Sequence, residues 1–254
     1  NYNTVVGDEA GTAITTGDRN TAVGFEAGLG TTTGSKNVAV GSYSLKANTT
    51  GISNIAVGDV SLNVSTTGSY NVAVGKAALG ANTTADNNTA VGYNSLAANT
   101  TGTLNVAVGS LALDANITGA ANTAVGYNAL SANTGDGATA VGKDALELNT
   151  TGINTAVGAN ALATVTSGTA NVAVGNDALT VNTAANNTAV GYAALTANTT
   201  GTGLVAVGTN ALDANTTASN NVGIGLNAAG ATTTGADNIA IGTNSLLTNT
   251  TGAS

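Results

Sequence analysis

A Val-Gly or Ile-Gly pair recurs along the whole of this chain of 254 residues. Successive anchor glycines lie 17 residues apart, except for three intervals of 16. Fifteen copies of one motif fill the chain, and their consensus is N-[TV]-A-V-G-x-x-A-L-x-A-N-T-T-G-x-x. The anchor glycines of the copies are Gly7, Gly24, Gly41, Gly58, Gly75, Gly92, Gly109, Gly126, Gly142, Gly158, Gly175, Gly191, Gly208, Gly225 and Gly242. A short fixed period is typical of repeat proteins, whose units pack on their neighbours in sequence. We therefore expect one repeat domain over residues 1–254.

The length and composition of a copy favour β structure. Seventeen residues are too few for two helices and their turns, and Gly and Thr are poor helix formers. Each copy holds two stretches that alternate, N-T-A-V-G and A-L-x-A-N, as half-buried strands do. The Gly, Asn and Thr between them are turn residues. The sequence therefore predicts an all-β fold, a β-solenoid of about fifteen 17-residue coils, each with two short strands and two turns.

Alternation also predicts which residues face inward. On the first strand we expect the Val or Ile directly before the anchor glycine, and the Thr, Val or Ile two residues earlier, to line the core. On the second strand we expect Leu, four residues after the glycine, and the residue two positions beyond it, such as Ala47 or Val64, to do so. No charged residue occupies these four columns; acidic residues lie in other columns or in turns, at Asp59, Asp114, Asp144, Asp177, Asp213 and Glu147.

Two other columns stay small although this assignment turns them outward. One is the Ala two residues before the glycine, such as Ala39, and the other is the Ala or Ser three residues after it, such as Ser44. A solvent-facing column would vary among larger polar residues, so the restriction predicts close approach by another backbone. We expect lateral packing against identical chains, most simply as a threefold bundle. The alternative is a tight bend within the same coil.

Asn and Thr recur as regularly as the glycine. Asn stands four residues before it in thirteen copies, with Ala138 and Leu204 as exceptions, and predicts a ladder of side-chain amides one coil apart. The alternative is a row of polar ligands. Thr stands eight residues after the glycine in fourteen copies, and a second Thr follows in twelve. Thr arrays suggest ice binding, but adjacent strand residues point to opposite faces. A Thr-Gly corner whose hydroxyls cap backbone groups is therefore favoured.

Two further patterns bear on binding. Several Asn-Thr-Thr triplets match the N-glycosylation sequon, which we interpret as a by-product of the turn, with a sugar-bearing row as the alternative; they begin at Asn48, Asn82, Asn99, Asn198 and Asn215. Aromatic residues directly follow the anchor glycine at Phe25, Tyr93, Tyr127 and Tyr192. These aromatic side chains share one turn edge, where they either cover the corner or stack on sugars. Lys76 and Lys143 occupy the same column, which indicates a solvated position.

Composition argues against several functional classes. The chain has no His and no Cys, which removes the usual general base, the thiol nucleophile and the best zinc ligands. Its acidic residues form no evident pair, so we predict no enzyme and no catalytic, cofactor-binding or metal-binding residues. A net charge of −8 argues against a nucleic-acid partner, because phosphate binding needs a basic surface. No apolar run reaches the roughly 18 residues of a membrane span, so no membrane insertion is expected in this segment.

The motif resembles repeats of known fibrous proteins. The N-x-A-V-G and N-x-A-I-G cores, at Asn71–Gly75 and Asn238–Gly242, resemble head repeats of trimeric autotransporter adhesins. The longer unit NTAVGYNSLAANTTG, at 88–102, is similar to repeats of phage tail-fibre proteins and of bacterial surface proteins with tail-fibre domains. The resemblance covers essentially the whole chain. It implies a left-handed β-roll with three chains side by side, outside the cell or on a virion. Adhesin head repeats are shorter, so each coil here has a longer turn.

These observations predict a structural and adhesive segment of a longer fibre. We expect a stiff, extracellular, homotrimeric spacer from a phage tail fibre or a bacterial surface appendage, which contacts a host-surface glycan or protein. One alternative is a filament subunit that polymerises end to end, because the first and last copies remain recognisable as repeats. The other alternative is an ice-binding β-solenoid.

Overall fold

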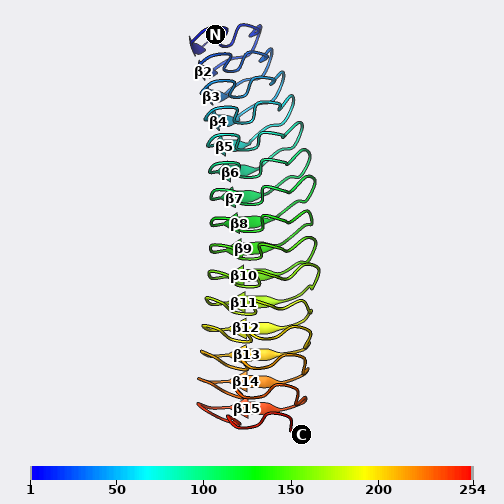
Figure 1. The fold of residues 1–254 in the computed structure, drawn as a ribbon. Helices are drawn as coiled ribbons and strands as arrows, with labels where there is room; N and C mark the ends of the chain where they lie inside the picture. The colour runs from blue at the N-terminus through cyan, green and yellow to red at the C-terminus, as the bar shows by residue number, and fades with distance from the viewer. Residues whose placement is uncertain (1, 253–254) are drawn as a thin grey trace. The chain divides into compact units, whose positions relative to one another are not determined.

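The computed structural model describes residues 2–252 and contains only β structure and turns within that range. Each copy of the motif forms one three-residue strand that ends directly before an anchor glycine (Figure 1). The strands are β1 (Thr4–Val6), β2 (Thr21–Val23), β3 (Val38–Val40), β4 (Ile55–Val57), β5 (Val72–Val74), β6 (Thr89–Val91), β7 (Val106–Val108), β8 (Thr123–Val125), β9 (Thr139–Val141), β10 (Thr155–Val157), β11 (Val172–Val174), β12 (Thr188–Val190), β13 (Val205–Val207), β14 (Val222–Ile224) and β15 (Ile239–Ile241).

The chain forms two compact units, Asn1–Thr134 with β1–β8 and Gly135–Ser254 with β9–β15. Within each unit, every strand pairs in parallel with the next strand along the chain. The register places equivalent residues opposite each other, as in Ala39 with Ala56 and Ala156 with Ala173. Each unit is therefore a stack of coils, one above the other (Figure 1). The predicted β-solenoid is confirmed, and its strands pair in parallel.

The predicted second strand of each coil is absent from the described residues, and this part of the prediction is wrong. The A-L-x-A-N stretch forms turns instead, because alternate residues adopt a left-handed backbone: φ is 56° at Tyr43 and 48° at Leu45. Such a chain coils too tightly to be an extended strand. The turns still stack by hydrogen bonds between coils, from Leu45 N to Ser61 O at 2.9 Å and from Thr49 N to Thr66 O at 2.8 Å.

The predicted orientation of the first strand is also wrong. The middle residue of strands β2–β15, an Ala in all but β14, faces the core, and Ala56 and Ala73 are fully buried. The residues on either side of it face outward, so that Ile55 is 40% exposed. Opposite a Leu the interior is narrow at this position, and the one Val found there, Val5 in β1, lies against Gly11, which replaces the Leu of that coil. At Gly223, which replaces the Ala, even an added Cβ would lie 3.0 Å from Leu212 Cγ and from Ala228 O.

The opposite wall of the coil supplies the Leu side chains, and this column was predicted correctly. Leu62 and Leu79 are fully buried, and burying a Leu stabilises the fold by about 1.5–3 kcal/mol. The Ala or Ser before the buried Leu residues is buried as well, as at Ser61. The two small columns therefore face the core, where tight packing within the coil keeps them small. The lateral packing predicted for them is wrong, and so is the inward position of Val64, which is 39% exposed.

The anchor glycine is required by two independent features of the coil. Gly41 has a φ of +129°, in the left-handed region that glycine adopts most easily. In addition, a Cβ on Gly41 would lie only 2.5 Å from the carbonyl oxygen of Gly58 in the next coil. The glycine column therefore sets both the turn after the strand and the close spacing of coils.

Candidate interaction surfaces

The first Asn column, four residues before the glycine, forms the predicted ladder. Asn54 donates from its side-chain amide to Asn37 Oδ1 at 3.2 Å and to Gly68 O at 2.8 Å. Its backbone N–H also donates to Asn37 Oδ1, at 2.9 Å. Each Asn thus closes its own coil and links that coil to its neighbour. Asn54 is fully buried, so the alternative interpretation of this column as a row of polar ligands is wrong.

A second Asn column lies seven residues after the glycine and was missed as a structural element. Asn99 donates from its side-chain amide to Asn82 Oδ1 and to Gly102 O, both at 3.0 Å. These are sequon residues, and both are fully buried, which contradicts the alternative of an exposed, sugar-bearing Asn row. Their recurrence at one position, the signal used for the first column, would have identified the second ladder too.

The Thr pair lies in a turn, as the Thr-Gly corner predicts. Thr49 Oγ1 donates to Thr66 O at 3.0 Å, and Thr66 Oγ1 donates to Thr83 O at 3.3 Å. The hydroxyl of the first Thr is therefore used inside the stack, whereas the second Thr, as at Thr50 and Thr67, is exposed. In the Gly135–Ser254 unit the first Thr is exposed as well, as at Thr150 and Thr183, although its hydroxyl still donates to the next coil. The pair lies in a turn in both units, not on the flat Thr face that we expect of an ice-binding solenoid.

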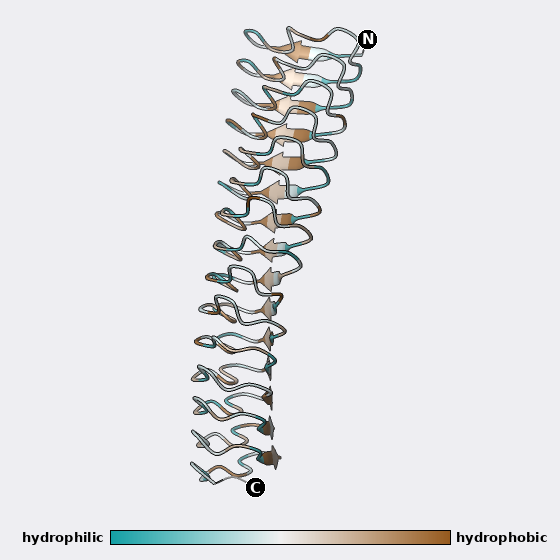
Figure 2. Ribbon diagram, turned by 90° about the vertical axis from the view of Figure 1, so that its right-hand side faces the viewer, coloured by the Kyte–Doolittle hydropathy of each residue, from teal (hydrophilic) through white to brown (hydrophobic). Residues whose placement is uncertain are grey.

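The outer face of the strands carries two columns of Thr, Val and Ile. Ile55 is 40% exposed, Val174 37% and Ile224 38%. No charged residue interrupts the strands in either unit. Figure 2 shows the strands largely in the colours of hydrophobic or neutral residues. This strand face is a regular apolar surface, and the structure puts it where the sequence predicted the core.

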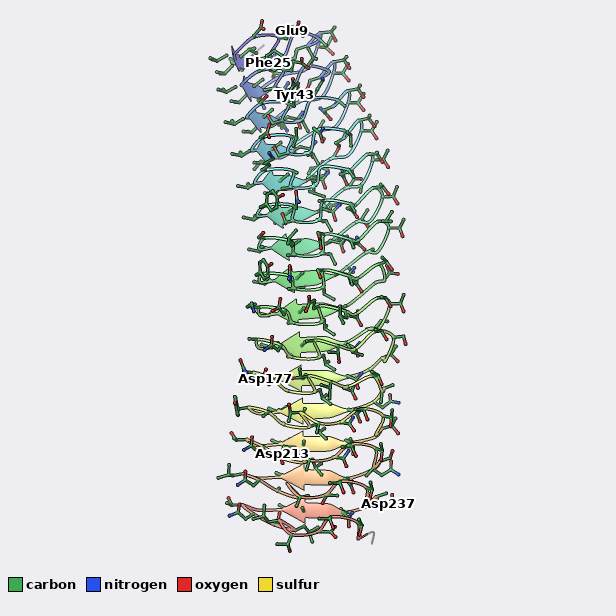
Figure 3. The ribbon with its side chains drawn as sticks, viewed as in Figure 1. Glu9, Phe25, Tyr43, Asp177, Asp213 and Asp237 are labelled. Atoms are coloured by element: carbon green, nitrogen blue, oxygen red, sulfur yellow. The ribbon has the colours of Figure 1, made fainter. Side chains whose placement is uncertain are left out.

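The aromatic residues after the anchor glycines divide into two groups. The Phe25 ring packs edge-on against Tyr43 of the next coil, with ring centroids 5.3 Å apart, and both are labelled in Figure 3. Phe25 therefore covers a corner, as one of the two interpretations predicts. Tyr93, Tyr127 and Tyr192 are 52%, 47% and 56% exposed.

Charged side chains are few, and some of them form local ion pairs at the surface. Lys46 Nζ lies 2.6 Å from Glu26 Oε2 and 4.9 Å from the Tyr43 ring centroid. Hydrogen bonding to Glu26 raises the pKa of Lys46 above its usual value. Lys76 pairs with Asp59 at 3.4 Å, and its side chain is 62% exposed, which confirms the solvated position predicted for this column.

The carboxyl groups of two Asp residues are partly buried, which disfavours their ionised form. Asp114 and Asp213 stand five residues after their anchor glycines, next to the buried Leu. Partial burial raises the pKa of both carboxyl groups, and their backbone hydrogen bonds offset only part of that effect. Among residues 2–252 no group of three or more His, Cys, Asp or Glu side chains could hold a metal ion.

Over residues 2–252 the surface has no pocket that could enclose a small molecule. Within the same range there is no helix long and apolar enough to cross a membrane. Two exposed surfaces are considered for binding below, the apolar strand face and the turn edge with its exposed tyrosines.

Comparison with known proteins adds no assignment. None of the protein-family models matches the chain, and no curated protein or solved structure is significantly similar to it.

Proposed function

We propose that this chain is a structural and adhesive segment of an extracellular fibre, in which three copies associate side by side into a stiff spacer. The resemblance of its repeats to adhesin heads and tail fibres favours a phage tail fibre or a bacterial surface appendage. The single observation that carries the proposal is the apolar strand face.

The strand face has the properties of an association surface. In the Asn1–Thr134 unit it comprises eight strands, which at about 4.8 Å per strand gives a strip about 34 Å long. Apolar surfaces that repeat without a charge are typical of protein–protein interfaces. A second copy presents the same columns at the same spacing, so Val and Thr side chains of two chains can interdigitate along the strip. Coil-to-coil hydrogen bonds supply the stiffness of the spacer.

The native mass tests this proposal. Light scattering is expected to give about 72 kDa, which is three times the chain mass of 24.0 kDa. The variant Val74→Lys/Val108→Lys places two charges on the strand face and is expected to give the mass of one chain, because each buried charge would be unpaired. The matched control Thr67→Lys/Thr101→Lys adds the same charges to the exposed turn column and is expected to keep the native mass.

Other outcomes separate the alternatives. A wild-type mass of 24.0 kDa at every concentration overturns the proposal. A mass that grows with concentration, together with filaments in negatively stained images, favours end-to-end polymerisation instead. Thermal hysteresis of freezing, lost in the variant Thr67→Lys/Thr101→Lys of the turn Thr column, favours the ice-binding alternative.

A further inference from the structure

The sequence Tyr-Asn occurs twice at the same place in the coil, at Tyr93–Asn94 and at Tyr127–Asn128. Both pairs directly follow an anchor glycine and belong to the Asn1–Thr134 unit. One coil lies between them, and it carries Ser110–Leu111 at this position. We call these two Tyr-Asn pairs the Tyr-Asn patch.

The backbone aligns the two halves of the patch along the stack. Leu111 N donates to Tyr93 O at 3.0 Å, and Asn128 N donates to Ser110 O at 3.2 Å. The three coils are therefore in register at this edge, and the two tyrosines stand two coils, or about 9.6 Å, apart. Ser110 between them is small, so both rings, each about half exposed, are accessible to one extended ligand.

The Asn side chains of the patch are available for a ligand. Within residues 2–252 neither Asn94 nor Asn128 uses its side-chain amide in a hydrogen bond. At the same position in other coils, Asn160 donates to Asp177 at 2.9 Å, and Asn227 donates to Asn244 at 3.1 Å. In the patch, Leu111 separates the two amides and offers neither of them a partner.

We propose that the Tyr-Asn patch binds a neutral, extended polysaccharide of β-1,4-linked hexopyranose rings that runs along the stack of coils. The inference rests on the proposed adhesive function and names its ligand class. A pyranose ring has an apolar face that packs on an aromatic ring and hydroxyl groups at its edge that pair with a side-chain amide. A neutral ligand fits because the chain's net charge is −8, which disfavours phosphate-rich partners.

The spacing of the tyrosines favours this linkage. In an extended β-1,4-linked chain, successive rings alternate the face they present, so every second ring offers the same face. Each ring also advances by nearly one coil spacing. Two tyrosines two coils apart can therefore stack on the equivalent faces of rings one and three, while the ring between them passes over Ser110.

Binding to a soluble polymer and to an oligosaccharide tests the proposal. Wild-type protein is expected to be retarded in native gels that contain hydroxyethyl cellulose and to bind cellohexaose in calorimetry. Tyr93→Ala and Tyr127→Ala are each expected to weaken the affinity about tenfold, equivalent to roughly 1.4 kcal/mol. Dextran, whose rings are α-linked, is expected to cause no retardation.

The chain offers a matched control. Tyr192 occupies the same position and is 56% exposed, but Ala193 follows it, and the equivalent positions two coils away are Ala159 and Leu226. Tyr192→Ala is therefore expected to bind like the wild type. Ala159 also shows that the coil accommodates Ala at this position, and unchanged thermal unfolding of each variant confirms that the fold is intact.

The outcomes distinguish this site from the proposed function. The proposed glycan site is overturned if the wild-type protein binds neither hydroxyethyl cellulose nor cellohexaose. It is also overturned if Tyr192→Ala loses as much affinity as Tyr93→Ala and Tyr127→Ala. Light scattering on the same samples reports separately on the association of chains. A native mass of about 72 kDa (three times 24.0 kDa) without glycan binding removes the site and leaves the fibre proposal intact.

Discussion

Asn37 Oδ1 accepts two hydrogen bonds from Asn54 of the next coil, one from the backbone N–H at 2.9 Å and one from the side-chain amide at 3.2 Å. Both residues lie in the interior, where a lost partner costs more than a hydrogen bond at the surface. The interior of this solenoid is therefore held in register by amide ladders as well as by packed Leu and Ala. The second ladder is interrupted in several coils, and the interruption at Ser65 can be tested.

Ser65 interrupts the second Asn column between Asn48 and Asn82. Asn48 Oδ1 and Ser65 Oγ are buried and have no hydrogen-bond partner, because the Ser side chain is too short to continue the ladder. Ser65→Asn is expected to restore it and to raise the free energy of unfolding by about 1 kcal/mol. Urea unfolding measures the change. The converse variant Asn99→Ser is expected to destabilise the fold by about 1–3 kcal/mol, and a stabilising effect of that variant would contradict the ladder.

The anchor glycines are predicted to tolerate no side chain. Gly58 has a φ of +135°, and an added Cβ would lie 2.5 Å from Gly75 O. Gly58→Ala is therefore expected to lower the free energy of unfolding by about 3 kcal/mol, from backbone strain and overpacking together. Gly80→Ala is the control, because its nearest contact would be 3.2 Å from Ala77 O and other coils carry Lys46 or Ala97 at this position. Equal effects of the two variants would argue against the close approach of coils at the anchor glycine.

The stability of the fold is expected to depend on pH through the carboxyl group of Asp213. Burial raises its carboxyl pKa above the ordinary Asp value of 3.8. The ionised form is therefore disfavoured in the folded chain, and the carboxyl group contributes stability below pH 3.8 that is lost as the pH rises through the folded-state pKa. Asp213→Asn is expected to raise the melting temperature at pH 7 and to change it little at pH 3. Melting curves at the two pH values measure this, and a larger gain at pH 3 would reverse the assigned sign.

Much of the architecture follows from the sequence alone because the repeat is nearly exact. The 17-residue period predicts stacked coils, and the recurrence of Asn, four residues before each glycine, predicts the ladder that Asn37 and Asn54 form. The Thr-Gly corner, with its hydroxyl on the next coil's carbonyl, was also predictable. Which side of the first strand faces the core was not predictable. Alternation shows that Ala56 and Val57 point in opposite directions, but it does not show which of them points inward.

The sequence by itself determined the coil, its period, the in-register stacking and the columns that repeat. Only the tertiary structure decided the inside and the outside of the first strand and the conformation of the A-L-x-A-N stretch. The reason is the width of the interior. Left-handed residues such as Leu45 (φ 48°) bring the opposite wall close enough for Ala to fit beneath the Leu column, whereas the one Val at this position, Val5, lies against Gly11 instead of a Leu. The approach of this wall depends on residues that follow the strand in the same coil. Because of it, the larger Val and Ile side chains of the strand point outward, where they form the surface proposed for association.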